Sequence, residues 1–145
     1  MKRFLAVCLT LLSGTAALYA VPENWTTDYD AAMKQAVKEK KAVLVLFTGS
    51  DWCPGCIALK RDTLTNRKFT DFAKAKLVTV YMDSPRRKPQ SPAERAMVMK
   101  LYRQLSPGPY IPATVIVAND GRILGRIQGY CPVDDYIKQI GEMIK

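Results

Sequence analysis

Two nearly uninterrupted apolar runs constrain the fold of this 145-residue chain more than any other feature. The first, KAVLVLFTG, spans residues 41–49, and the second, LVTVYMD, spans residues 77–83. Apolar runs rich in β-branched residues are typical of strands that are buried on both faces of a sheet. Such strands need helices on each face to cover them, so the runs favour an α/β domain.

Helical patterns precede the first run and separate it from the second. Residues 26–41 predict an amphipathic helix with Thr27 or Asp28 as its N-cap. Residues 57–64 predict a second helix, and residues 66–76 a third helix or a turn. The apolar positions that we expect to face the sheet are Tyr29, Ala32, Met33, Ala36 and Val37 in the first helix and Phe69 and Phe72 in the third.

The second half of the chain continues the alternation of helices and strands. Residues 91–94, SPAE, form a capping-box pattern that predicts a helix ending near Leu105. A third strand is expected within residues 108–120, a fourth within residues 121–129 after an NDG turn, and a last helix over residues 132–145. The expected inward positions are Met97, Leu101, Leu105, Val133, Tyr136, Ile137, Ile140 and Ile144.

The first twenty residues have the pattern of a signal peptide. Two basic residues precede an apolar stretch with small residues near its end, and cleavage is expected between Ala20 and Val21. The stretch is short for a membrane span and no second apolar segment of that kind follows it, although an uncleaved anchor is the alternative. We therefore expect a periplasmic or secreted domain of residues 21–145 without stable membrane insertion.

The chain is basic, with 22 Lys and Arg against 13 Asp and Glu and a net charge of +9, or about +7 without residues 1–20. Such a surface could meet nucleic acid, anionic membranes or acidic proteins. The cations are scattered and no nucleic-acid recognition motif is present, so no nucleic-acid partner is expected. The densest basic patch, PRRKPQ at residues 85–90, is interpreted as a solvated loop.

Cys53 and Cys56 follow the first apolar run in the segment TGSDWCPGCIALK. A zinc site needs about four ligands, usually Cys and His. The chain has no His, and after residues 1–20 Cys131 is its one cysteine beyond the pair, so no metal is expected. A disulfide that closes so short a loop restrains the unfolded chain very little, which argues against a purely structural bridge.

The position of the pair favours redox chemistry instead. Cys53 lies at the expected start of a helix, where backbone dipoles and free N–H groups favour the thiolate. The thiolate is the attacking species in thiol–disulfide exchange. We expect an exposed Cys53 sulfur to attack a substrate disulfide and the more shielded Cys56 to resolve the mixed disulfide, with no cofactor beyond this dithiol.

The motif LVLFTGSDWCPGC, the strand VYMD, the Ile111–Pro112 step and the turn at Gly129 together resemble the thioredoxin superfamily over residues 25–145. More narrowly, the chain is similar to exported relatives of bacterial periplasmic disulfide reductases. The resemblance implies a thioredoxin fold, with a mixed sheet of four or five strands flanked by helices in a single domain. It also implies a cis Pro112 and a backbone at Ile111 that can pair with an extended substrate. The implied supporting or substrate-binding residues are Trp52, Pro54, Gly55, Ile111 and Pro112.

The resemblance further implies a thiol:disulfide oxidoreductase that reduces exported proteins and receives electrons from a membrane protein of the DsbD type. Strong oxidants of the family commonly have His inside the motif, and its absence here favours a reductase or general disulfide exchanger. A disulfide oxidase or isomerase stays an alternative. The Pro54–Gly55 order inverts that of thioredoxin and leaves the redox poise open. The alternative is a non-enzymatic chaperone or binding module that engages exported proteins through the apolar surface around Trp52, Ile111 and Tyr130.

The chain departs from the family at the buried acid–base pair that serves the second thiol. Leu46, next to Phe47, occupies the aligned position of the carboxylate, and Val80 replaces the lysine. Proton transfer must then use water or another group. Asp51 is a candidate, although we interpret it as an exposed turn residue.

Cys131 precedes Pro132 and is expected at the N-cap of the last helix. The favoured interpretation is a small buried residue. The alternative is a reactive third thiol.

Overall fold

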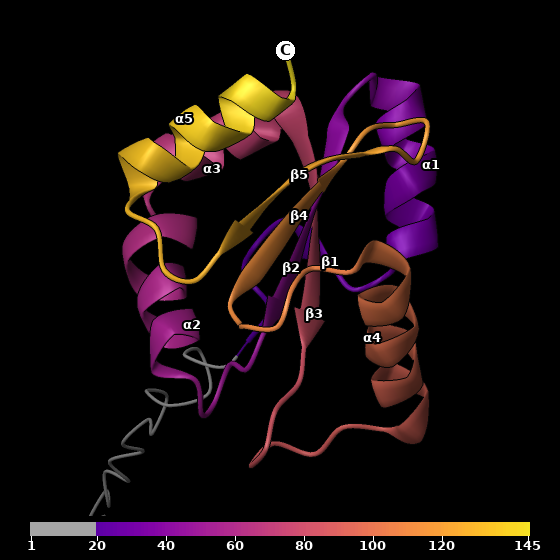
Figure 1. The fold of residues 1–145 in the computed structure, drawn as a ribbon, viewed down its shortest axis with the longest axis vertical. Helices are drawn as coiled ribbons and strands as arrows, with labels where there is room; N and C mark the ends of the chain where they lie inside the picture. Colours follow the sequence, from indigo (N-terminus) through magenta and orange to yellow (C-terminus); the bar gives the residue numbers. More distant parts are fainter. Residues whose placement is uncertain (1–19) are drawn as a thin grey trace, which may run out of the picture.

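The computed structural model describes residues 20–145, which form a five-stranded mixed sheet between two layers of helices (Figure 1). The strand order is β1-β3-β2-β4-β5, with β1, β2 and β3 parallel, β4 antiparallel to β2, and β5 antiparallel to β4. In chain order the elements are β1 (Trp25–Thr26), α1 (Tyr29–Glu39), β2 (Ala42–Thr48), α2 (Pro54–Leu59), the π-helical η2 (Lys60–Leu64), α3 (Arg67–Lys76), β3 (Leu77–Asp83), α4 (Pro92–Leu105), β4 (Ala113–Val117), β5 (Ile123–Gln128) and α5 (Val133–Met143). The predicted α/β sheet is confirmed, with five strands. The predicted signal peptide lies outside the described residues except for Ala20.

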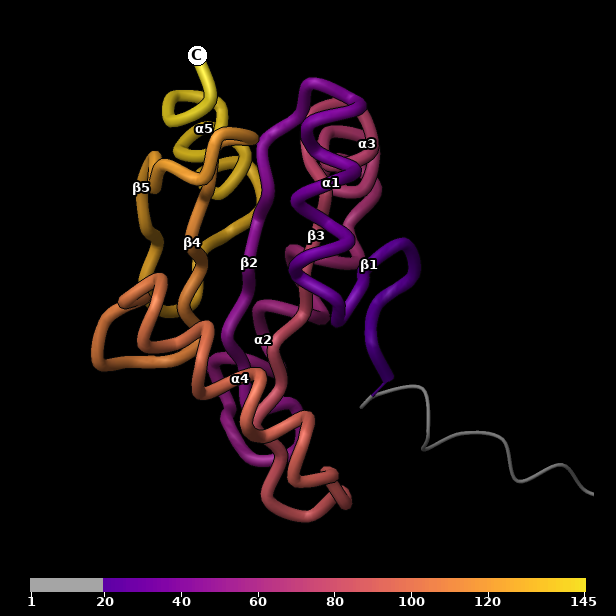
Figure 2. Tube along the Cα trace, turned by 90° about the vertical axis from the view of Figure 1, so that its right-hand side faces the viewer, coloured from indigo at the N-terminus to yellow at the C-terminus, as the bar shows by residue number. Residues whose placement is uncertain are grey.

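The helices are divided between the two faces of the sheet. Helices α1 and α4 cover one face, and α2, α3 and α5 cover the other (Figure 1). Seen after a quarter turn, the strands lie side by side from β5 to β1 (Figure 2). None of the helices within residues 20–145 is both long enough and apolar enough to cross a membrane.

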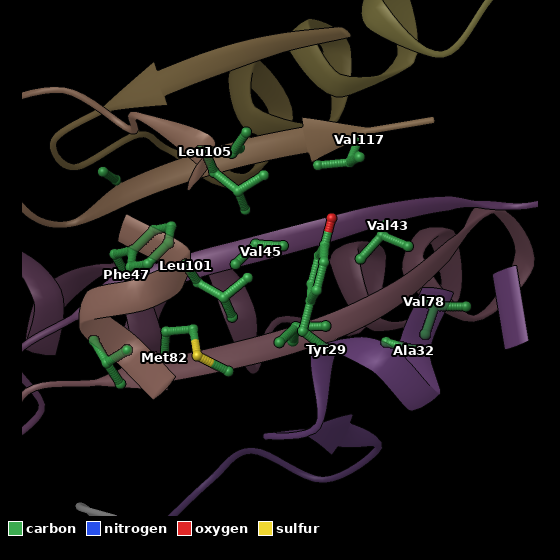
Figure 3. Close-up of a cluster of buried hydrophobic side chains, with 14 of the residues drawn as sticks. Tyr29, Ala32, Val43, Val45, Phe47, Val78, Met82, Leu101, Leu105 and Val117 are labelled. Carbon is green, nitrogen blue, oxygen red and sulfur yellow. The ribbon is translucent and has the colours of Figure 1, made fainter. Parts of the chain in front are cut away.

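The uninterrupted apolar run of β2 supplies both hydrophobic cores. Val43, Val45 and Phe47 face α1 and α4 and pack with Tyr29 and Leu101 (Figure 3). The alternate residues of β2 face α2, α3 and α5 and belong to the second core cluster. The members of that cluster from β2 are Ala42, Leu44 and Leu46. Because side chains alternate along a strand, a strand buried on both faces must be apolar at every position.

Two expected helix caps are confirmed. The Asp28 carboxylate accepts a hydrogen bond from the Ala31 backbone N–H at 2.9 Å and begins α1. Ser91 and Glu94 form the capping box of α4, with Glu94 N to Ser91 Oγ at 3.2 Å and Ser91 N to Glu94 Oε2 at 2.7 Å. These local contacts fix where each helix begins, so sequence spacing alone could predict them.

Two apolar side chains that were expected to face the sheet are exposed instead. Val37 is 59% exposed and Met97 is 38% exposed. The inward stripe of α4 consists of Val98, Leu101 and Leu105, spaced by three and four residues. Val98 therefore takes the place predicted for Met97, because one residue turns a helix by about 100° and moves the neighbouring side chain off the buried stripe.

Candidate active site

The Cys53–Cys56 pair lies at the end of the sheet where the parallel strands β2 and β3 terminate and β4 begins (Figure 1). Cys53 is the N-cap of α2 in an extended conformation, with Pro54 as the first helical residue. The Cys56 backbone N–H points to Cys53 Sγ at 3.2 Å. The expectation that the first cysteine begins a helix is confirmed, and one free amide of that helix start, that of Cys56, points at its sulfur.

The two cysteines are joined by a disulfide, with 5.2 Å between their Cα atoms. Cys53 is 6% exposed and Cys56 is 3% exposed, so the prediction of an exposed Cys53 sulfur is wrong. The segment before β4 lies against this sulfur, with Ile111 O at 3.8 Å from Cys53 Sγ. On the inner side, the Gly49 backbone N–H donates to Cys56 Sγ at 3.4 Å.

The Ile111–Pro112 peptide bond is cis, as the resemblance implied. A Cβ atom on Gly55 would lie 3.4 Å from Pro112 Cδ, so the motif and the proline are in direct contact. The carbonyl of Pro112 accepts a hydrogen bond from the Gly129 backbone N–H at 2.8 Å, and Gly129 has a φ of +78° that suits glycine. The structure therefore brings Gly55, Ile111 and Pro112 together around the disulfide, and their roles toward substrate stay predictions.

Trp52 is held beside the disulfide by contacts that the sequence did not reveal. Its indole Nε1–H donates to the Ser84 carbonyl at 2.8 Å. The ring also covers Gly49 so closely that a Cβ there would lie 2.6 Å from the indole. Glycine at this position is thus required by the close approach of Trp52, because any side chain would displace the ring.

No carboxylate occupies the positions that correspond to the family's buried acid–base pair. Leu46, Phe47 and Val80 are all at most 2% exposed and belong to the two core clusters. The Cys56 proton therefore cannot pass to a buried carboxylate at these positions.

Asp51 is buried rather than exposed, with 4% of its surface accessible, which corrects its interpretation as an exposed turn residue. Its carboxylate accepts hydrogen bonds from the backbone N–H groups of Arg86, Arg87 and Lys88 at 2.8 to 2.9 Å. Burial pushes the pKa of this carboxyl upward, but the three amides outweigh burial and hold the pKa below its usual value. Sequence reasoning missed this contact because the partners lie 35 to 37 residues away.

Cys131 is unpaired and 6% exposed, in the core cluster that includes Tyr136. Its Sγ accepts a hydrogen bond from Gln139 Nε2 at 3.3 Å. Burial, and then the charge of Asp135, raise the pKa of this thiol. The N-cap of α5 is Pro132, so the prediction that Cys131 caps this helix is wrong. These contacts favour the interpretation of Cys131 as a small buried residue.

The charged and sulfur-bearing side chains of the described part of the chain do not gather into a metal site. Within residues 20–145, no group of three or more His, Cys, Asp or Glu side chains is placed to hold a metal ion. The chemistry that this arrangement offers is the exchange of two electrons between the Cys53–Cys56 pair and another disulfide or dithiol.

Comparison with known proteins supports this chemistry. Residues 29–144 match the family described as Thioredoxin-like domain. A curated relative, the disulfide bond reductase DsbH of Chlamydia pneumoniae, is 28% identical over 116 residues, which cover 80% of this chain and 69% of that protein. A solved structure of DsbH oxidoreductase superposes with a TM-score of 0.77 at 25% identity and covers 93% of each chain.

A second curated relative is longer than this chain. The thioredoxin-related protein DsbJ of Chlamydia pneumoniae is 23% identical over 137 residues, which cover 90% of this chain. The aligned part is 39% of DsbJ, so the chain spans about two fifths of that relative. The predicted thioredoxin fold and family resemblance are confirmed by these matches and by the sheet order.

Proposed function

The chain belongs to the thioredoxin-like domain family and is a thiol:disulfide oxidoreductase, and we propose that its Cys53–Cys56 pair reduces disulfides of exported proteins. The observation that carries the proposal is the position of Cys53. Its sulfur lies at the start of α2 and 3.8 Å from the Ile111 carbonyl oxygen. An extended substrate segment that pairs with the backbone at Ile111 would bring its disulfide next to Cys53.

Attack begins from the reduced protein. The Cys53 thiolate attacks one sulfur of the substrate disulfide, the substrate S–S bond breaks, and the other substrate sulfur leaves as a thiolate that takes a proton from water. The Cys56 backbone N–H, 3.2 Å from Cys53 Sγ, supports the anionic sulfur before attack. The product of this step is a mixed disulfide between Cys53 and the substrate.

Resolution completes the two-electron transfer from the dithiol to the substrate. Cys56 Sγ attacks Cys53 Sγ, the bond to the substrate breaks, and the pair closes to the disulfide seen in the structure. Leu46, Phe47 and Val80 offer no proton acceptor, and the Asp51 carboxylate is occupied by backbone amides. We infer that the Cys56 proton passes to the departing substrate sulfur, directly or through water, since that thiolate is a base formed beside it.

Reduction is the proposed direction, and it requires a continuous supply of electrons. Each substrate disulfide reduced leaves the Cys53–Cys56 pair oxidised, and no cofactor besides this dithiol is proposed. A membrane protein of the DsbD type would restore the dithiol. The relative named disulfide bond reductase supports this direction over oxidation.

The test is to trap the mixed disulfide. With a disulfide-containing substrate such as insulin, Cys56→Ser should accumulate a covalent adduct that dithiothreitol releases, and Cys53→Ser should form none. Wild-type protein should accelerate insulin reduction by dithiothreitol. Wild-type turnover no faster than that of Cys53→Ser would contradict the enzyme and leave the binding-module alternative. If the wild-type protein is active, its equilibrium potential against glutathione decides between a reductase near about −270 mV and an oxidant near about −120 mV.

Export is part of the proposal and rests on the pattern of residues 1–20. After expression of the full chain in a bacterium, the protein recovered outside the inner membrane should begin at Val21. Recovery of a chain that still begins at Met1 and fractionates with membranes would support the uncleaved anchor instead.

A further inference from the structure

The segment that connects β3 to α4, residues 84–90, is packed against the disulfide motif; we call it the basic loop. It leaves the sheet at the same end as the motif because β2 and β3 are parallel neighbours (Figure 1). The Ser84 backbone N–H donates to the Thr48 carbonyl at 2.8 Å, which extends the pairing past the strands. The loop thus starts directly beside the segment that carries Cys53.

Asp51 clamps the basic loop to the motif. Its buried carboxylate accepts three consecutive backbone N–H groups, those of Arg86, Arg87 and Lys88. Asp51 lies two residues before Cys53 in the chain. The hydrogen bonds to Asp51 therefore attach the backbone of the loop to the motif, next to the reactive cysteine. A loop held by three charge-assisted hydrogen bonds is positioned rather than freely solvated.

Trp52 provides a second attachment. Its indole N–H donates to the Ser84 carbonyl at 2.8 Å. The guanidinium carbon of Arg86 lies 3.6 Å from the centroid of the Trp52 ring, a cation–π contact. One cation of the loop is therefore fixed over the residue that immediately precedes Cys53.

The charges of this region are segregated, with cations outside and carboxylates inside. Arg86, Arg87 and Lys88 are exposed. Asp51 is buried, and the Asp83 side chain, 11% exposed, holds Lys88 Nζ at 3.3 Å.

Lys60 adds a fourth cation to this edge. Burial, and then the nearby charge of Lys88, lower the pKa of Lys60. The nearby Glu94 carboxylate is engaged in the capping box at Ser91. A partner approaching Cys53 over this edge meets mainly positive charge.

We propose that the basic loop makes acidic protein segments the preferred substrates, by favouring disulfides flanked by Asp or Glu. This inference rests on the proposed exchange activity of Cys53 and adds no covalent step to it. Opposite charges on the two partners speed the encounter and fix its orientation, whereas like charges oppose it. The loop is close enough to the motif for flanking residues of a bound substrate to reach it.

The test compares two synthetic peptides that share one disulfide and differ only in flanking Glu or Lys residues. We expect the reduced protein to react with the Glu peptide roughly tenfold faster at low salt. The ratio of the two rate constants should approach one at about 0.5 M NaCl, where the Debye length is only a few ångströms. Equal rates at low salt would overturn the preference while leaving the exchange activity intact.

The loop variant is Arg86→Gln/Arg87→Gln/Lys88→Gln, which should lower the rate ratio to within about twofold of one. Its control is Lys38→Gln/Lys76→Gln/Lys145→Gln, which removes the same charge from exposed positions and should keep the wild-type ratio. Lys38 and Lys76 lie just before β2 and β3 begin, at the end of these strands away from the motif, and Lys145 ends the chain. If the loop acted only on the Cys53 thiolate, the loop variant would react more slowly with both peptides by the same factor. The ratio of the two rate constants would then be unchanged, which would overturn the proposal. No reaction with either peptide would refute the exchange activity itself and this preference with it.

Asp51 should act as a positioning residue for the loop. Asp51→Asn keeps the shape but loses the charge and one acceptor oxygen, so the ratio should fall about threefold, and Asp51→Glu should restore part of it. A purely structural role would lower both peptide rates and leave their ratio unchanged.

Discussion

Cys53 and Cys131 lie at the start of different helices and are equally accessible, at 6% exposure each, yet their surroundings differ. Cys53 is itself the N-cap of α2, and the backbone N–H of Cys56 points at its sulfur. Cys131 precedes the N-cap Pro132, and its sulfur meets only the Gln139 side chain among the hydrogen bonds of the described chain. Neither exposure nor nearness to a helix start predicts thiol chemistry, because one residue of offset decides whether backbone amides reach the sulfur.

The two sites also differ in what a substrate can reach. Cys53 lies 3.8 Å from the Ile111 carbonyl, at the backbone segment where we propose that an extended substrate adds. Cys131 belongs to a buried core cluster, and its backbone carbonyl accepts a hydrogen bond from the buried Thr63 hydroxyl at 2.7 Å. A reactive sulfur needs both an amide that supports its charge and a partner segment that can approach it.

The largest expected difference between the two cysteines is in turnover. Cys53→Ser should lower insulin-reduction activity by about a thousandfold or more, because the attacking thiolate is removed. Cys131→Ser should keep activity within about twofold, because Cys131 takes no part in the proposed exchange. Comparable losses in both variants would make Cys131 a third catalytic thiol.

The alkylation rates of Cys53 and Cys131 should also differ, by a smaller factor than the turnover of the two variants. In the reduced protein at neutral pH, a small alkylating agent should modify Cys53 at least about tenfold faster than Cys131, since only the thiolate reacts and burial raises the pKa of Cys131. Mass spectrometry of digested protein measures both rates in one sample. Denatured protein, in which the two thiols should react at similar rates, is the control.

Stability should depend on Cys131 by a modest amount. Cys131→Ala removes a buried sulfur and should lower the free energy of unfolding by about 1 kcal/mol at neutral pH. The pKa of Cys131 is raised in the folded state, so the stabilising protonated form is fully populated below the unfolded pKa of about 8.5. That contribution is lost as pH rises through the folded pKa.

The gap in unfolding free energy between wild type and Cys131→Ala should therefore narrow between pH 7 and about pH 10. Urea denaturation of both proteins across this range provides the measurement. Burial raises the pKa values of Tyr81 and Tyr136 above their usual range, so neither side chain titrates in the folded protein between pH 7 and pH 10. A gap that widens with pH would mean that the folded protein stabilises the Cys131 thiolate.

The smallest expected effect is that of Gln139→Ala. The Gln139 side chain donates to Cys131 Sγ and partly offsets the burial that raises the pKa of this thiol. Its removal should slow alkylation of Cys131 at alkaline pH by about two- to threefold and leave Cys53 unchanged. Faster alkylation of Cys131 would show instead that Gln139 acts mainly as a cover over the sulfur.

Much of the fold could be predicted because its signals are local. Strand β2 is apolar from Ala42 to Phe47, Asp28 caps α1 and SPAE begins α4, and each feature depends on residues within a few positions of one another. The two-residue strand β1 escaped prediction because Trp25 and Thr26 are too short a segment to show a pattern, and they form a strand only by pairing with β3. Burial was harder to predict, as the exposed Met97 shows, because one residue of helix rotation decides it.

The sequence by itself determined the alternation of helices and buried strands, the paired cysteines at a helix start and, through its resemblance, the family. The tertiary structure alone decided that Asp51 is buried beneath residues 86–88, that Arg86 lies over Trp52, and that Cys131 misses the N-cap of α5. The first group depends on the spacing of neighbours along the chain. The second depends on where β3 delivers the following loop and on the exact turn at which a helix begins, and these distances exist only once the sheet has formed.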